Sequence, residues 1–403
     1  MICKYTSENL PVIHSFGKMP IANNFLDKKN FEDEFFYNLE FSFSESISLF
    51  QINNYPDVKK MFHSNYSFFS SLSSHMKKHF EEFYSHLKKK GYFDEKSFVV
   101  EIGCNDGVLI ENFKKNKIKH LGVEPSTNVA DIAKTKGIEI LNDFFNEKSV
   151  NKITSSYGEA DLIVAANVIC HIPDLKGLFS SVKNLLKYGG FFIFEEPYLL
   201  DMVSKVSYDQ IYDEHIYIFS LLSIDNICKD IGLSLFECEH QDTHGGSMRY
   251  FITKQSNYEK TTNLKNCINQ EIAKNLHKIE TFYDFALNCE KSKTSLINNL
   301  IYLKDNNNSV YGYGATSKST TILNYCNIGP DLIECICDIT PEKQNKYSPG
   351  MHIPILNEKY GKDNPPDCFL LFAWNHYKEI IQKEREYLNS GGKFITHLPN
   401  NVF

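Results

Sequence analysis

The sequence predicts an α/β protein with a doubly wound parallel sheet at its centre, a small β-rich unit before it and a further α/β unit after it. The central prediction rests on residues 97–198, where buried apolar runs such as FVVEI and DLIVAA alternate with segments of amphipathic helical composition. Such alternation is typical of parallel sheets covered by helices on both faces. A second strand-to-helix start occurs at residues 309–326, and later apolar runs continue the pattern. A chain of 403 residues has room for more than one such unit.

We divide the chain at residues 75 and 255. Aromatic and apolar residues in near alternation over 34–52 favour a small antiparallel unit, so 1–75 is predicted as an N-terminal domain. Residues 76–255 form the predicted central domain. The composition after 256 is polar and helical, and we expect 256–403 to be a helical linker followed by the C-terminal α/β domain.

Composition excludes several classes of protein. A net charge of −7 lacks the basic field of a nucleic-acid binder, so a small-molecule substrate is expected. The 11 cysteines are odd in number and never spaced C-x-x-C, which favours reduced thiols in a cytoplasmic protein. No apolar run is long enough to span a membrane, and the first residues lack the pattern of a signal peptide. We expect a monomer without nucleic-acid or membrane partners.

A glycine-containing loop follows the first strand of the central unit. In VVEIGCNDG, Gly103 and Gly107 would let the backbone approach a ligand, and Asn105 lies between them. Glu101 precedes the loop, and Glu124 ends the next strand, where an acid can accept hydrogen bonds from ribose hydroxyls. The E-x-G-x-x-x-G order is typical of S-adenosylmethionine methyltransferases and suits a cofactor without a pyrophosphate. The alternative is an ordinary strand-to-helix turn with a solvated carboxylate.

Two later strand ends agree with a methyl donor. Asp143 and Phe144 follow the third strand, where an acid and an aromatic ring could hold an adenine. Asn167 and His171 follow the fourth strand, on the side where open α/β sheets bind ligands.

A dense group of polar side chains follows the fifth strand. His215 could serve as a general base because the unperturbed pKa of histidine lies close to neutral pH. If the segment is extended, Tyr212 and Glu214 share one side; if it is helical, Tyr212 and His215 share a face. A structural loop held by ion pairs is the alternative. The group consists of Tyr198, Tyr208, Tyr212, Asp213, Glu214 and His215.

Two further loops are candidates for contact with substrate. His244 and Arg249 flank a glycine pair, which indicates either a tight turn beside a phosphate or a β-hairpin turn. Tyr313 and Lys318 belong to YGYGATSKS, where glycines, hydroxyls and a lysine could meet phosphate, or where a fold element binds nothing. Asn345, Lys346 and His376 are weaker candidates in surface loops.

Several ordered strings together resemble the sugar C-methyltransferase family over residues 1 to 400. They include EIGCNDG, LGVEPS, CHIPD, DQIYDEH, HGGSMRY, YGYGATSKST and FAWNH, of which YDEH and GATSKS are the most specific. Enzymes of that family use S-adenosylmethionine to add a branch methyl to nucleotide-linked deoxysugars destined for antibiotics or cell-surface glycans.

The resemblance implies a class I methyltransferase fold between a small N-terminal domain and a C-terminal domain that helps to hold the nucleotide-sugar. It also implies methylation at carbon 3 of a 4-keto-deoxysugar. The histidine matching His215 would be the base, and the residues matching Tyr66, His171, Tyr212 and Glu214 would line the sugar. Elementary chemistry agrees, because a ketone beside the C–H bond stores the developing charge as an enolate that donors can stabilise. O- or N-methylation of a glycan precursor, and a silent nucleotide-sugar-binding subunit, are the alternatives.

The N-terminal domain departs from the family, whose members usually bind zinc with two C-x-x-C pairs. Here the matching positions hold Cys3, Thr6, Ser44 and Ile47. One thiolate cannot build a closed tetrahedral site, and His14 is a poor replacement, so we expect no zinc. Aromatic packing should offset its loss, with Phe35, Phe36, Tyr37, Phe41 and Phe43 as the candidates.

Overall fold

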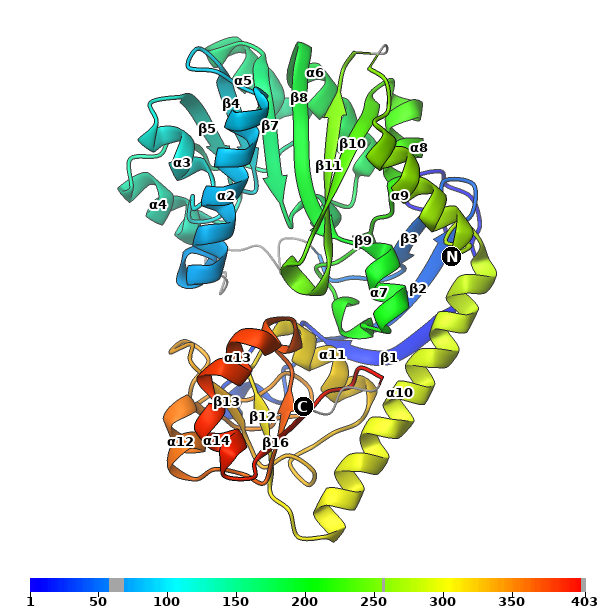
Figure 1. Cartoon of the computed structure of the whole chain (residues 1–403), viewed down its shortest axis with the longest axis vertical. Helices are drawn as coiled ribbons and strands as arrows, with labels where there is room; N and C mark the ends of the chain where they lie inside the picture. The colour runs from blue at the N-terminus through cyan, green and yellow to red at the C-terminus, as the bar shows by residue number, and fades with distance from the viewer. Residues whose placement is uncertain (58–68, 256–257, 400–403) are drawn as a thin grey trace.

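Three sheets make up the protein, seen in a computed structural model that describes residues 1–57, 69–255 and 258–399. A seven-stranded sheet occupies the upper part of the molecule, and a five-stranded sheet occupies the lower part (Figure 1). The blue strands of a four-stranded N-terminal sheet lie between them (Figure 1).

The seven-stranded sheet is doubly wound, as the sequence predicts. Its order is β10-β11-β8-β7-β4-β5-β6, and neighbours from β8 to β6 run parallel. At the other edge β11 is antiparallel to both β8 and β10, and the strands β10 and β11 lie beyond the residues 97–198 on which the parallel pattern was predicted. The strands are β4 (Phe98–Ile102), β5 (Lys119–Val123), β6 (Ile140–Leu141), β7 (Ala160–Ala166), β8 (Leu186–Pro197), β10 (Ser234–Gln241) and β11 (Ser247–Thr253).

Helices cover both faces of this sheet because successive strand residues point to opposite sides. Val99 of β4 belongs to an apolar cluster with α2 and α3, whereas its neighbour Val100 belongs to the cluster that contains α6 and α8. The helices are α2 (Ser74–Lys90), α3 (Ile110–Lys115), α4 (Thr127–Thr135), α5 (Glu147–Tyr157), α6 (Leu175–Leu185), α7 (Leu199–Lys205) and α8 (Leu221–Ile231).

The N-terminal sheet takes its fourth strand from the middle of the chain. Its antiparallel order is β1-β2-β3-β9, and β9 follows the segment that carries His215. Phe41 and Phe43 are buried in its core, but Phe35 and Phe36 are each 41% exposed, so the prediction that these two pack inside was wrong. The strands are β1 (His14–Pro20), β2 (Phe36–Ser44), β3 (Leu49–Ile52) and β9 (Tyr217–Ile218).

Two helices connect the upper and lower sheets. The first is α9 (Thr262–Ala273), and the longer α10 (Ile279–Asp305) runs down one side of the molecule (Figure 1). The lower sheet is parallel throughout, in the order β14-β13-β12-β15-β16. Its strands are β12 (Val310–Tyr313), β13 (Ile336–Asp338), β14 (Ile355–Asn357), β15 (Cys368–Leu371) and β16 (Lys393–Ile395), and its helices are α11 (Ser317–Tyr325), α12 (Glu358–Asp363), α13 (Tyr377–Lys383) and α14 (Arg385–Asn389). The divisions at 75 and 255 stay a prediction.

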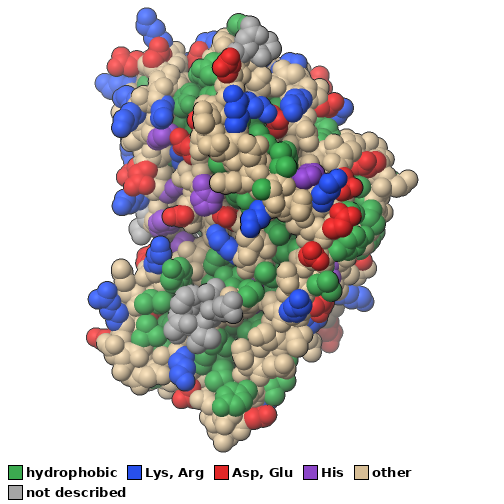
Figure 2. All heavy atoms as spheres, turned by 45° about the vertical axis from the view of Figure 1, so that its right-hand side comes forward, with side chains coloured by type: hydrophobic (Ala, Val, Ile, Leu, Met, Phe, Trp, Pro, Cys, Tyr) green, Lys and Arg blue, Asp and Glu red, His purple; other side chains and the backbone are tan. Residues whose placement is uncertain are grey.

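Charged side chains of both signs are interspersed over the face shown in Figure 2, in keeping with the small net charge. Among the helices of the described residues, none has both the length and the apolar character needed to cross a membrane.

Candidate active site

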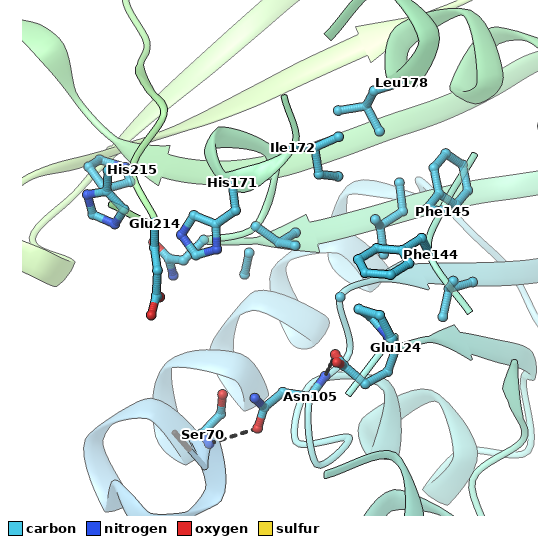
Figure 3. A pocket seen from close by; sticks show the side chains of 18 of the residues that line it. Ser70, Asn105, Glu124, Phe144, Phe145, His171, Ile172, Leu178, Glu214 and His215 are labelled. Atoms are coloured by element: carbon cyan, nitrogen blue, oxygen red, sulfur yellow. Dashed lines mark hydrogen bonds between the residues drawn. The ribbon is translucent and has the colours of Figure 1, made fainter. Parts of the chain in front are cut away.

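A cavity of about 870 Å³ lies where the three sheets meet. The N-terminal segment contributes Asn23, the central sheet contributes loops at the carboxyl ends of its parallel strands, and the lower sheet contributes Lys318 and His376. Figure 3 shows the interior, with the aromatic rings of Phe144 and Phe145 at one end and the imidazoles of His171 and His215 at the other.

The glycine loop forms one wall of this cavity. Gly103 has φ +65°, and a Cβ there would lie 2.4 Å from Cγ2 of Val168, so a larger residue does not fit. The backbone N–H of Asn105 donates to Glu124 Oε2 (2.9 Å, dashed in Figure 3), and that of Ser126 donates to Oε1 (2.8 Å). These bonds fix the Glu124 carboxylate at the cavity wall, although burial raises its pKa. A fixed carboxylate of this kind can accept hydrogen bonds from ribose hydroxyls.

Other predicted donor-binding residues divide into two groups. Asn167 lines the cavity with φ +55°, and its buried Oδ1 has no hydrogen-bond partner in the described structure, so it is available to a ligand. Phe144 also lines the cavity. Three residues do not: Glu101 is buried beneath the loop, Gly107 packs against Ile138 and Asp143 forms an ion pair with Lys152 (2.9 Å).

His215 is held by hydrogen bonds at both ring nitrogens. Its Nδ1 lies 2.7 Å from the backbone oxygen of Gln210, which can only accept, so Nδ1 carries the proton. Its Nε2 therefore has the lone pair and accepts from the hydroxyl of Tyr212 at 2.8 Å. Burial, followed by the positive charge that a protonated His171 would carry, keeps the pKa of His215 well below the usual value. The ring is thus a neutral base with its lone pair defined.

The local backbone explains why Tyr212 and His215 meet. The N–H of His215 donates to the carbonyl of Tyr212 at 3.0 Å, which closes a turn and places both side chains together, as the helical alternative would have done. The ring centroids of His171 and His215 are 5.4 Å apart, and Glu214 also lines the cavity (Figure 3). Burial lowers the pKa of His171 to about 4.

Glu196, at the end of β8, supports the turn that carries His171. One of its oxygens accepts three consecutive backbone N–H groups, from Val168 (2.9 Å), Ile169 (2.6 Å) and Cys170 (3.3 Å). Burial nevertheless raises the pKa of Glu196 to about 7.

Cationic and imidazole groups gather where the lower sheet meets the cavity. Lys318 Nζ donates to the carbonyl of His244 (3.2 Å) and lies 5.1 Å from the ring centroid of Trp374. Burial lowers the pKa of Lys318, while the nearby charge of Asp209 opposes that shift. Burial, followed by the positive charge of Lys318, lowers the pKa of His244 to about 3. The same two causes lower the pKa of His376. His244 lies in the turn between β10 and β11, so the hairpin interpretation and the cavity contact both hold.

Four predicted substrate residues lie away from the cavity. Tyr198 donates to Glu271 (2.8 Å), and Tyr313 donates to Glu384 (2.8 Å). Arg249 is buried in ion pairs with two glutamates, and Asn345 lies in a loop beside β14. Tyr66 is outside the described residues.

The structure also brings in residues that sequence reasoning missed. They are Asn23, Gln210, Ser317 and Asn375. Gln210, Ser317 and Asn375 belong to the strings DQIYDEH, YGYGATSKST and FAWNH, which could have pointed to them. No local signal identifies Asn23, because it reaches the cavity by contacts with Glu214 and Ser317, which are 191 and 294 residues away in the chain.

Two groups of side chains bear on whether the chain binds a metal. Ligand atoms of Cys170, His171 and His215 lie within 4.8 Å of one another, but both nitrogens of His215 already have hydrogen-bond partners. Cys3 belongs to no group of three possible ligands within residues 1–57, 69–255 and 258–399, and its sulfur accepts from the backbone N–H of Thr6 at 3.4 Å. The residues present do not fit a structural zinc.

Comparisons with known proteins agree with this geometry. A family described as "Methyltransferase domain" matches residues 72–237, and one described as "C-methyltransferase C-terminal domain" matches residues 242–399. The chain is 28% identical to C-methyltransferase NovU from Streptomyces niveus over 387 residues, which is 96% of this chain and 92% of NovU. The chain is thus similar to C-methyltransferases over nearly its whole length.

The chain is an S-adenosylmethionine-dependent methyltransferase with a class I methyltransferase fold. A ubiquinone biosynthesis O-methyltransferase from Colwellia psychrerythraea is 23% identical over 108 residues, which is 26% of this chain and 43% of that protein. Among solved structures, magnesium protoporphyrin IX methyltransferase from Synechocystis with bound S-adenosylmethionine matches 44% of this chain and 79% of its own, with 14% identity and a TM-score of 0.34. An S-adenosylmethionine-dependent methyltransferase from Clostridium acetobutylicum matches 44% and 91%, with 17% identity and a TM-score of 0.35.

Proposed function

We propose that this methyltransferase acts on carbon 3 of a nucleotide-linked 4-keto-deoxysugar, with His215 as the base. The observation that carries the proposal is the state of His215, whose Nε2 lone pair is fixed at the cavity by the Nδ1 contact with the Gln210 carbonyl. A neutral imidazole of defined tautomer is suited to removing a proton from a carbon acid.

The donor half of the cavity fits S-adenosylmethionine. Glu124 would accept from the ribose, Gly103 leaves room for close approach of the backbone, and Asn167 offers an unpaired buried oxygen. When bound, S-adenosylmethionine supplies an electrophilic methyl group to a carbon nucleophile. The chain's own residues must create that nucleophile and hold it in place.

Proton transfer is the chemical step assigned to this chain. His215 Nε2 takes the proton from carbon 3, and the electrons of that C–H bond move into the neighbouring ketone to give an enolate. Tyr212 donates to the same lone pair in this structure, so we expect its hydroxyl to move to the ketone oxygen when the sugar binds. Burial raises the pKa of Tyr212, which keeps it a hydrogen-bond donor. Donors aimed at a developing oxyanion give some of the largest catalytic effects known.

The diphosphate of the substrate would lie at the wall of the cavity formed by Lys318, His244 and His376. The ammonium of Lys318 has three hydrogens, and its recorded bond to the His244 carbonyl uses one of them. His244 and His376 beside it could donate further hydrogen bonds or become charged next to a phosphate.

The test is mass spectrometry of candidate nucleotide-linked 4-keto sugars incubated in deuterated water. Without the donor, wild type should exchange one hydrogen at the reacting carbon; with the donor, it should add one methyl group. His215→Asn should lower both rates by about 10²- to 10⁴-fold while donor binding in calorimetry is unchanged. Methylation that persists in His215→Asn would instead indicate an oxygen or nitrogen acceptor, and absence of both reactions with every sugar would reject the proposal.

A further inference from the structure

A two-residue segment of the N-terminal unit is inserted between the catalytic turn and helix α11. The N–H of Ala22 donates to Asp213 Oδ1 (2.9 Å), and the carbonyl of Ala22 accepts from Thr320 Oγ1 (2.8 Å). Thr321 Oγ1 also donates to the carbonyl of Ile211 (3.0 Å). The segment is thus bonded to residues on both sides of the cavity wall.

The side chain of Asn23 continues this link into the cavity. Its Nδ2 donates to Glu214 Oε1 at 2.7 Å, and its Oδ1 accepts from Ser317 Oγ at 2.8 Å. Asn23, Glu214 and Ser317 all line the cavity. A carboxamide can donate to the carboxylate and accept from the hydroxyl at once, which an ionised aspartate at the same position could not do.

We propose that Asn23 is a positioning residue that holds the Glu214 carboxylate ionised and directed at the sugar, with Ser317 fixing the orientation of the amide. Glu214 then accepts a hydrogen bond from a sugar hydroxyl and sets the carbon acid in line with His215. The identity of the ligand in this inference rests on the proposed function; the link between Asn23 and Glu214 does not.

The neighbouring carboxyl supports an ionised Glu214. Asp213 is fully buried, and burial together with the charge of Glu214 raises its pKa. Two adjacent buried carboxyls do not both ionise readily. Each accepts one amide N–H, Asp213 from the backbone of Ala22 and Glu214 from the side chain of Asn23. The raised pKa of Asp213 assigns the shared proton to Asp213 and the negative charge to Glu214.

Kinetics of Asn23 variants separate positioning from a general structural role. For Asn23→Ala we expect kcat to fall about 100-fold while KM for the sugar changes by less than about threefold, because misalignment of the reacting groups affects the chemical step. Asn23→Asp should be slower still at pH 8 and should recover activity as the pH is lowered, since a proton shared by the two carboxyls restores a donor to Glu214. The exposed neighbour Asn24 provides the control, and Asn24→Ala should keep wild-type kcat.

A double-mutant cycle provides a readout that needs no sugar. The thermal midpoint of unfolding is measured for wild type, Asn23→Ala, Glu214→Gln and the double variant. Above pH 7 the double variant should lose less than the sum of the two single losses. Additive losses would overturn the inference, as would a coupled pair whose Asn23→Ala variant keeps wild-type kcat. If wild type methylates none of the sugars while the pair is coupled, the proposed function fails and the Asn23–Glu214 link is upheld.

Discussion

The hydrogen bond from His215 Nδ1 to the Gln210 carbonyl has a consequence for the pH dependence of the enzyme. Burial keeps the pKa of His215 well below 6.5, so the base stays neutral under mildly acidic conditions. Because kcat/KM reports the free enzyme, its value should be flat from pH 8 to pH 6.5 and should decline only below that range. An acidic inflection at or above pH 6.5 in the rate profile would contradict the assigned state of this ring.

The lowered pKa of His171 predicts how the stability of the protein depends on pH. Its pKa is about 4 in the folded protein and near 6.5 when unfolded, so between those values the unfolded chain binds more protons. Its contribution is therefore fully present above pH 6.5 and is lost as the pH falls toward 4, with a slope of up to about 1.4 kcal/mol per pH unit. Urea unfolding at several pH values should show that His171→Asn has a shallower decline than wild type. Equal slopes would mean that His171 is not buried in its neutral form.

Sequence reasoning located at the cavity those residues whose position follows from topology, while their role in donor binding stays a prediction. Gly103, Glu124 and Asn167 follow β4, β5 and β7, three neighbouring parallel strands whose carboxyl ends meet at one edge of the sheet. It failed for Tyr198 and Arg249, whose side chains do not line the cavity. Tyr198 is hydrogen-bonded to Glu271, and Arg249 forms an ion pair with Glu195. Such a choice between partners depends on the folded chain and leaves no local pattern.

At the scale of elements, the N-terminal sheet holds the segment that carries His215 in place. Strand β9 follows His215 directly and pairs with β3, and the N–H of Ile52 donates to the carbonyl of Ile216 at 2.9 Å. The antiparallel unit was predictable from the alternation over 34–52, but its fourth strand was not, since a two-residue strand has no detectable period. The sheet thus supports the wall of the cavity as well as forming a small folded unit.

Hydrogen bonds occupy the region of Ser44, one of the positions at which the family resemblance implies a zinc ligand. The hydroxyl of Ser44 donates to Glu8, as does that of Ser46 at 2.7 Å. We expect Glu8→Ala to lower the free energy of unfolding by about 1–2 kcal/mol, because the variant removes two hydrogen bonds to a partly exposed charged group. Denaturant unfolding measures the loss, and Glu32→Ala, at an exposed position, should have no effect.

The stability of the N-terminal sheet should not depend on a bound metal. Dialysis of wild type against a chelator should leave the thermal midpoint unchanged, because one cysteine among these residues cannot form a zinc site. A midpoint that falls with the chelator and returns with added zinc would show that other residues bind the ion.

At the scale of the whole molecule, Lys318 joins the lower sheet to the central one through the carbonyl of His244. If its ammonium meets the diphosphate of the substrate, Lys318→Met should raise KM for the nucleotide-sugar about tenfold or more, as expected for loss of a charged hydrogen bond. Donor binding in calorimetry should be unchanged. The exposed Lys378→Met is the control, and an unchanged KM in Lys318→Met would place the diphosphate elsewhere.

The three-part organisation could be anticipated from the two strand-to-helix starts, whereas the cavity between the parts could not. Its walls depend on how separate sheets approach one another, as the contacts of Asn23 with Glu214 and Ser317 show. Periodicity defines elements within a unit but contains no information about such junctions.

Lys318 and His376 lie late in the chain, so they are synthesised after most of the other residues that line the cavity. During synthesis the methyl-donor crevice and His215 leave the ribosome well before the last wall of the cavity exists. A product truncated near residue 255 would retain the donor-binding loops yet lack the cationic side of the cavity. The cavity is therefore complete only when the residues from Thr316 to His376 are present.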